Sequence, residues 1–136
     1  MITQKHIYLQ PFGRGYHLIT SKILKETGDL PQTGLINLFI QHTSAALTIN
    51  ENCDPAVRQD METISNHLVP DGDPRYVHDY EGDDDMPAHF KSSMMGVSLT
   101  IPISNGKLDM GTWQGIYLCE FRNNGGSRKI TVTIYS

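Results

Sequence analysis

The stretch "VSLTIPISNGKLDMGTWQGIYLCEFRNNGGSRKITVTIY", residues 97–135, decides the fold class. Apolar and polar residues alternate in "VSLTIPI" (97–103) and in "KITVTIY" (129–135), which is typical of strands with one face on a core. Between these two segments, "GIYLCEF" (115–121) is a third strand pattern. The C-terminal part of the chain is therefore predicted to consist of strands joined by turns.

The segments before residue 97 add further strands and one short helix. Residues 2–9 alternate weakly, and residues 34–41 form a short apolar run bounded by turn residues, so both are predicted strands. Residues 45–50 continue as another strand, antiparallel to its neighbour. Residues 19–27 are predicted to form a short helix that ends at Gly28, a favourable position for glycine.

The clearest helix signal begins at Asp54, a good N-cap residue, and at Pro55, which suits the first helical position. Pro70 ends the pattern. Apolar residues recur at spacings of four, three and four, which predicts one face packed on a core; they are Val57, Met61, Ile64 and Leu68. The sum is a single α+β domain over residues 1–136, a mostly antiparallel sheet or sandwich with two helices on one side.

Composition restricts the possible functions. The 136 residues carry a formal net charge of -4, which argues against broad binding of nucleic acid or anionic lipid, because both need a basic surface. The N-terminal segment lacks the features of a signal peptide, and the apolar runs are too short to cross a bilayer. Cys53 and Cys119 lie far apart without a CxxC pair, so we expect reduced thiols and a cytoplasmic protein.

Residues 70–93 are predicted to form a long loop rich in proline and glycine, and such loops are often functional. This loop carries His78 and His89 together with an acidic run that includes Asp85. Imidazole and carboxylate together suit zinc or another divalent cation. Asp85 is the carboxylate expected to point inward, because it is nearest to the "PAH" turn. The alternatives are a solvated loop or histidines that only form hydrogen bonds.

A second candidate motif is "QHTSAALTINEN", residues 41–52. His42 ends a predicted apolar strand, where a scaffold can present a reactive group. The alternative for His42 is a histidine at the edge of the core that is bonded to the backbone. Ser44 lies two residues further on, but without a G-x-S-x-G motif it does not indicate a serine hydrolase.

A third candidate motif is "LDMGTWQGIYLCEFR", residues 108–122. Trp113 can stack on a flat ring, or can equally be a core residue. Glu120 and Arg122 alternate on one strand face, so they can pair with each other or face a pocket. A bound phosphate needs cations and N–H or O–H donors; the candidates are Lys91, Ser92, Arg122, Arg128 and Lys129.

Together, "HTSAALTINEN" (42–52), "DDDMPAHFKSS" (83–93), residues 97–122 and "RKITVTIY" (128–135) resemble the YjbQ-like family over nearly the whole chain. Met86 departs from the family pattern, in which many members carry Asn. The resemblance implies an α+β sandwich, a homotrimer with pockets near subunit boundaries, and a weak secondary thiamine-phosphate synthase activity. That reaction joins a pyrimidine diphosphate to a thiazole phosphate and releases pyrophosphate.

The resemblance also implies roles for individual residues. A divalent metal, zinc or magnesium, is expected on His42, His78, His89 and Asp85. The expected catalytic residues are His42, His89 and Glu120, with Glu120 orienting a substrate amine or a water. The expected substrate-binding residues are Lys91, Ser92, Thr112, Trp113 and Arg122. Two other functions remain open: a metal-dependent hydrolase, and a trimeric protein that binds a small phosphorylated metabolite.

Overall fold

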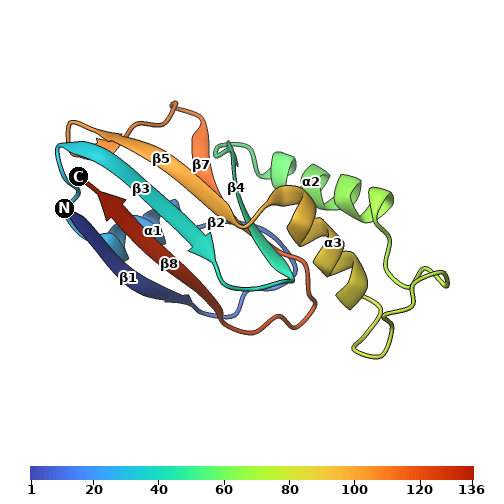
Figure 1. Cartoon of the computed structure of the whole chain (residues 1–136). Helices are drawn as coiled ribbons and strands as arrows, with labels where there is room; N and C mark the ends of the chain where they lie inside the picture. The colour runs from blue at the N-terminus through green and yellow to red at the C-terminus, as the bar shows by residue number, and fades with distance from the viewer.

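The computed structural model describes residues 1–136 and consists of two antiparallel sheets packed face to face (Figure 1). The five-stranded sheet has the order β1 (Ile2–Leu9), β8 (Arg128–Tyr135), β3 (Thr33–Ile40), β5 (Ser98–Ser104) and β6 (Lys107–Leu108). The three-stranded sheet has the order β2 (Gly15–Leu18), β7 (Gln114–Glu120) and β4 (Ala45–Glu51). The predicted α+β class with antiparallel strands is confirmed.

The core lies between the two sheets and follows from the alternation in the sequence. Ile7 of β1 lies opposite Ile130 of β8, and Leu38 of β3 lies opposite Val132 of β8. All four of these side chains are buried. Because side chains alternate along a strand, every second residue of these strands points to the outer face of the five-stranded sheet. That outer face is not covered by any helix (Figure 1).

The helix α2 (Pro55–Leu68) begins as predicted. The Asp54 carboxylate accepts a hydrogen bond from the Ala56 N–H at 2.9 Å, and Pro55 occupies the first helical position. The predicted core face of this helix is wrong in its second half, since Ile64 and Leu68 are 56% and 64% exposed. The helix α1 (Thr20–Thr27) ends at Gly28, also as predicted.

The predicted long loop is wrong beyond residue 84, because a third helix, α3 (Asp85–Met95), occupies its second half. The hydrophobic pattern concealed this helix, since its exposed side carries Phe90 and Met94. Its buried side is largely polar and consists of Asp85, Pro87, Ala88, Lys91 and Ser92. A proline in the first turn is compatible with a helix, so Pro87 does not break it.

Both α2 and α3 lie at one end of the sandwich, where α2 packs on β2 and α3 on β4 (Figure 1). The connection between them, residues 69–84, bends back toward the end of β7. This arrangement brings the start of α3 close to Arg122, which follows β7. The two shortest strands, β2 and β6, were not predicted, because each is next to a turn and has four residues or fewer. None of the three helices is long and apolar enough to cross a membrane.

Candidate functional site

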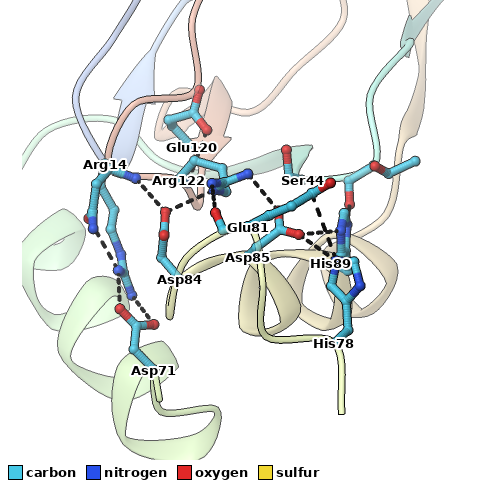
Figure 2. A network of polar contacts seen from close by, with 12 residues as sticks. Arg14, Ser44, Asp71, His78, Glu81, Asp84, Asp85, His89, Glu120 and Arg122 are labelled. Carbon is cyan, nitrogen blue, oxygen red and sulfur yellow. Dashed lines mark hydrogen bonds and ion pairs between the residues drawn. The ribbon is translucent and has the colours of Figure 1, made fainter. Parts of the chain in front are cut away.

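Four side chains that can ligate a metal meet at the start of α3: His78, Glu81, Asp85 and His89. Their ligand atoms all lie within 4.8 Å of one another. His78 Nε2 is 2.7 Å from Asp85 Oδ2, and His89 Nε2 is 3.1 Å from the same oxygen (Figure 2). Glu81 Oε2 is 3.9 Å from His78 Nε2. We call these four residues the metal-ligand group.

Local backbone geometry brings the four residues together. Asp85 and His89 are one helical turn apart on α3, so their side chains lie on the same face of the helix. His78 and Glu81 come from the preceding loop, which turns at Gly82 with a φ of 113°. A larger residue would be strained at this positive φ, and its Cβ would lie 2.9 Å from Asp84 Oδ1, so Asp84 would also have to shift.

A second layer of hydrogen bonds orients the metal-ligand group. His89 Nδ1 is 2.8 Å from the carbonyl oxygen of Thr43. Arg122 Nη1 donates to Asp85 Oδ1 at 2.5 Å, while Arg122 Nε donates to Asp84 Oδ2 at 2.8 Å (Figure 2). Such outer partners fix the orientation of ligands in protein metal sites.

Both ring nitrogens of His89 face a hydrogen-bond acceptor, Thr43 O on one side and Asp85 Oδ2 on the other. A neutral imidazole has only one N–H, so it can donate to one of the two. The arrangement is satisfied either by a doubly protonated ring or by a cation held between Nε2 and Oδ2. The chemistry of the four residues therefore fits a cation.

The exposure of the group suits an ion that also contacts a substrate or water. The Asp85 side chain is 2% exposed, whereas those of His78 and His89 are 33% and 31% exposed. Two imidazoles with carboxylates are typical ligands of zinc, whereas magnesium is usually held by oxygen ligands. The donor set thus favours zinc or a similar transition metal.

Asp85 of the metal-ligand group and the neighbouring Asp84 are held in their ionised form. Burial alone would raise the pKa of Asp85, but hydrogen bonds with His78 and Glu81 and the charge of Arg122 lower it below the usual value. Burial likewise opposes ionisation of Asp84, while the Asn123 N–H and Arg122 lower its pKa overall. The site therefore presents negative charge, which attracts cations.

The model for the family described as UPF0047 protein YjbQ-like matches residues 5–136. The chain belongs to the YjbQ family. It is 53% identical over 133 residues to the YjbQ protein of Escherichia coli O157:H7, and 54% identical over 133 residues to that of Salmonella typhimurium. Each alignment covers 96% of both chains.

Solved structures share the fold. A YjbQ-like protein of unknown function from Sulfolobus solfataricus superposes with a TM-score of 0.84 at 26% identity, covering 98% of this chain and 96% of that one. An uncharacterized YjbQ family protein of Clostridium acetobutylicum gives a TM-score of 0.79 at 38% identity, covering 96% and 98%. The resemblance to the YjbQ family inferred from the sequence is confirmed.

His42 lies outside the metal-ligand group of this YjbQ family member, although the sequence analysis predicts it as a metal ligand. Its Nε2 accepts a hydrogen bond from the Lys129 backbone N–H at 2.8 Å. Burial and the charge of Arg128 lower the pKa of His42, so the neutral form that accepts this bond is favoured. The structure shows the alternative reading, a histidine bonded to backbone at the edge of the core.

Glu120 also lies outside the group, in a buried ion pair. Arg128 Nε donates to Glu120 Oε1 at 2.8 Å, and Arg128 Nη2 donates to Oε2 at 2.5 Å and to Ser44 Oγ at 3.0 Å. Gly125 closes over this carboxylate, since a Cβ there would lie 2.3 Å from Oε1. Glu120 pairs with Arg128 rather than with Arg122, and no side of its carboxylate is open to solvent.

The predicted anion-binding residues are dispersed. Lys91 Nζ is buried and donates to Asn66 Oδ1 at 2.8 Å, and Ser92 Oγ donates to the Ala45 carbonyl at 2.7 Å. Arg122 is the only one of these residues that contacts the metal-ligand group. Each of the three guanidinium nitrogens of Arg122 already donates one hydrogen bond, to Asp84, to Asp85 and to the Glu81 carbonyl, so Arg122 serves first to position this part of the chain.

Thr112 and Trp113 lie at the opposite end of β7 from Arg122. A seven-residue strand is about 20 Å long, so within one chain Trp113 cannot stack on a molecule held at the metal-ligand group. Trp113 is 62% exposed, so the alternative prediction, that Trp113 is a core residue, is wrong. A role for Thr112 or Trp113 at the site would need a second chain.

Two contributors to the site were missed in the sequence. Glu81 stands three residues after His78, and Asp84 contacts Arg122. Recognition of α3 as a helix would have drawn attention to the Asp85–His89 pair, whose spacing of four residues is typical of ligands on one helix face. The contact of His89 with the Thr43 carbonyl could not be predicted, because every residue has a backbone oxygen and its residue type does not show where that oxygen points.

Proposed function

We propose that this YjbQ family member is a metal-dependent enzyme that acts on a small phosphorylated metabolite at the metal-ligand group. The convergence of His78, Glu81, Asp85 and His89, with ligand atoms within 4.8 Å, carries this proposal. The outer bonds to His89 and Asp85 support it, because a purely solvated histidine cluster has no need of such orientation. Zinc is the proposed ion.

The specific reaction that we propose is the transfer expected from the family resemblance. The thiazole ring nitrogen forms a bond to the methylene carbon of the pyrimidine diphosphate, while the C–O bond to the diphosphate breaks. Pyrophosphate leaves with the electron pair of that bond. A divalent cation supplies the charge neutralisation that this leaving group needs. Arg122 cannot supply it, because Asp84 and Asp85 already balance its charge.

Metal-dependent hydrolysis is the second candidate, and the position of Glu81 favours it. The Glu81 side chain is half exposed at 3.9 Å from His78, whereas Asp85 is buried and tied to Arg122. An exposed carboxylate beside a metal site can act as a general base toward water. In that case His78, Asp85 and His89 hold the ion, and Glu81 takes the proton.

We also propose a homotrimer in the cytoplasm. The uncovered face of the five-stranded sheet exposes five large apolar or aromatic side chains, namely Ile2, Tyr8, Leu35, Phe39 and Tyr135. Leu35 lies directly opposite Tyr135 in the register of β3 and β8, so they form one patch. An exposed apolar patch of this kind supports an interface between copies. Mass measurement in solution tests it, with Phe39→Asp expected to release monomers.

Metal analysis and activity on untagged protein test the proposed enzyme. We expect one zinc ion per chain, and we expect His89→Ala to lower zinc affinity at least 100-fold. His67→Ala is the matched control, because His67 is exposed on α2 and outside the group. Synthase activity should disappear on chelation and return with zinc.

The outcomes separate the candidates. Zinc binding without thiamine phosphate formation would remove the transfer reaction and leave hydrolysis of phosphorylated metabolites to be screened. Absence of stoichiometric metal, with activity unchanged by chelation, would overturn both enzymatic forms. Equal zinc affinity of His67→Ala and His89→Ala would show that the metal-ligand group is not the binding site.

A further inference from the structure

A hollow of about 390 Å³ lies between α2 and the start of β2, apart from the metal-ligand group. Only one of its seven lining residues is hydrophobic. The lining residues that matter here are Arg14 and His17 from the β2 side and Arg58, Gln59 and Glu62 from α2. A polar hollow of this size can hold a small metabolite.

Arg58 is the exceptional residue of this hollow. Four of the five arginines in the chain form ion pairs with carboxylates. Arg58 has neither an ion pair nor a hydrogen bond, and its Nε is buried without an acceptor. The only other buried side-chain polar atom without a hydrogen bond is Arg14 Nε, and Arg14 lines the same hollow. The two terminal nitrogens of Arg58 are not buried and make no bond within the chain, so their N–H groups are available to a ligand in the hollow.

The carboxylates around the hollow hold Arg14 rather than Arg58. Arg14 Nη1 is 2.6 Å from Asp71 Oδ2, and Arg14 Nε is 3.3 Å from Glu62 Oε1, so two carboxylates balance Arg14. The same Glu62 also accepts a hydrogen bond from Asn66 Nδ2 at 2.9 Å. Neither carboxylate forms an ion pair with Arg58. The two arginines and two carboxylates balance in total charge, but Arg58 is the one cation at the hollow that no carboxylate contacts.

We infer that this hollow binds the oxyanion group of a small metabolite, a phosphate or a carboxylate, with Arg58 as its principal donor. The arginine fork matches either group with two parallel N–H···O bonds. The side-chain amide of Gln59 adds a donor on the same side of α2. The remaining volume accommodates the organic part of the ligand.

This oxyanion site shares no residue with the metal-ligand group, but hydrogen bonds connect the two. Arg14 Nη1 is 3.3 Å from Asn123 Oδ1, and the Asn123 N–H donates to Asp84 Oδ2, which also binds Arg122. Figure 2 shows the labelled side chains running from Arg14 past Asp84 and Arg122 to Asp85. The site needs no metal ion, so the test of anion binding does not depend on the proposed enzymatic activity.

Titration of the chelator-treated full chain with inorganic phosphate tests the inference. We expect saturable binding by calorimetry, and changes of amide chemical shifts for residues 14–17 and 58–62. Arg58→Ala should weaken phosphate binding at least tenfold, and Arg58→Lys should weaken it less, because it keeps the charge but loses the fork. Arg75→Ala is the control, since Arg75 pairs with Asp73 on the exposed loop.

Acetate as a second probe distinguishes the two oxyanions: stronger binding of acetate than of phosphate assigns the site to carboxylates. No saturable binding of either anion would overturn the inference. The same holds if Arg58→Ala binds phosphate as tightly as the unmodified chain, or if His89→Ala rather than Arg58→Ala abolishes binding. Circular dichroism verifies that Arg58→Ala is folded, as expected for a residue without side-chain partners.

Discussion

Arg122 donates from Nη1 to Asp85 Oδ1 at 2.5 Å, and this bond leaves Asp85 Oδ2 free to face His78 and His89. Arg122 follows β7, whereas Asp85 begins α3, so the sheet sets the orientation of a carboxylate on a helix. The two oxygens of Asp85 thus have different tasks. One is fixed to the scaffold, and the other is presented to the histidines.

Arg122→Ala is expected to lower zinc affinity about 10- to 100-fold, although Arg122 is not a ligand, because outer partners of metal ligands contribute this much. Competition with a chromophoric chelator measures the affinity. Arg122→Lys should recover part of the loss, since it restores the charge without the fork. Arg75→Ala should match the unmodified protein, and an unchanged affinity in Arg122→Ala would contradict the positioning role.

His42→Ala is expected to separate stability from metal binding. It removes the acceptor of the partly buried Lys129 N–H, and loss of this hydrogen bond lowers the free energy of unfolding by about 1 kcal/mol. Zinc affinity should not change. Urea denaturation and zinc competition measure the two quantities. A large loss of zinc affinity would mean that His42 is a ligand after all.

Sequence patterns predicted the strands well, because one face of each strand is buried and side chains alternate. They failed for α3, since its buried side carries Asp85 and Lys91 while Phe90 and Met94 face outward. A polar buried helix face cannot be distinguished from a loop by hydrophobic periodicity. The site that this helix builds was consequently assigned to a loop.

The metal-ligand group was partly predicted from residue type alone. The sequence analysis grouped His78, Asp85 and His89 because their segment is short and few other residues in it can bind a cation, and these three side chains do lie together. His42 and Glu120 were added by motif membership, which does not specify where a side chain points. Their bonds to Lys129 and Arg128 depend on contacts between distant strands, which no local pattern reveals.

Lys91→Met is expected to leave the free energy of unfolding unchanged or to raise it by about 1 kcal/mol, because replacement of a buried charge by an apolar group of similar size is often neutral or stabilising. Asn66 Oδ1 keeps a donor in this variant, since Arg14 Nη2 also binds it at 2.7 Å. Lys91→Ala should instead lose about 2–4 kcal/mol through the cavity it leaves. Urea denaturation in chelator compares the two. Similar losses in both would show that the Lys91 charge is itself stabilising.

Stability at alkaline pH is expected to depend on two buried acids, Tyr16 and Cys119, which belong to one apolar cluster. Burial raises the pKa of Tyr16 from 10.0 to about 12, and that of Cys119 from 9.0 to about 12. The folded state therefore holds these protons more tightly than the unfolded state. Their contribution is complete below pH 9 and is lost as the pH rises from 9 toward 12.

Tyr16→Phe and Cys119→Ala should each make the alkaline fall in the free energy of unfolding shallower, whatever their effect on stability at pH 7. Urea denaturation at several pH values from 7 to 11 gives these slopes. Tyr80→Phe is the matched control, because Tyr80 is exposed and lies outside this cluster. Curves for Tyr16→Phe and Cys119→Ala that run parallel to the unmodified curve would show that neither group is responsible for the alkaline loss.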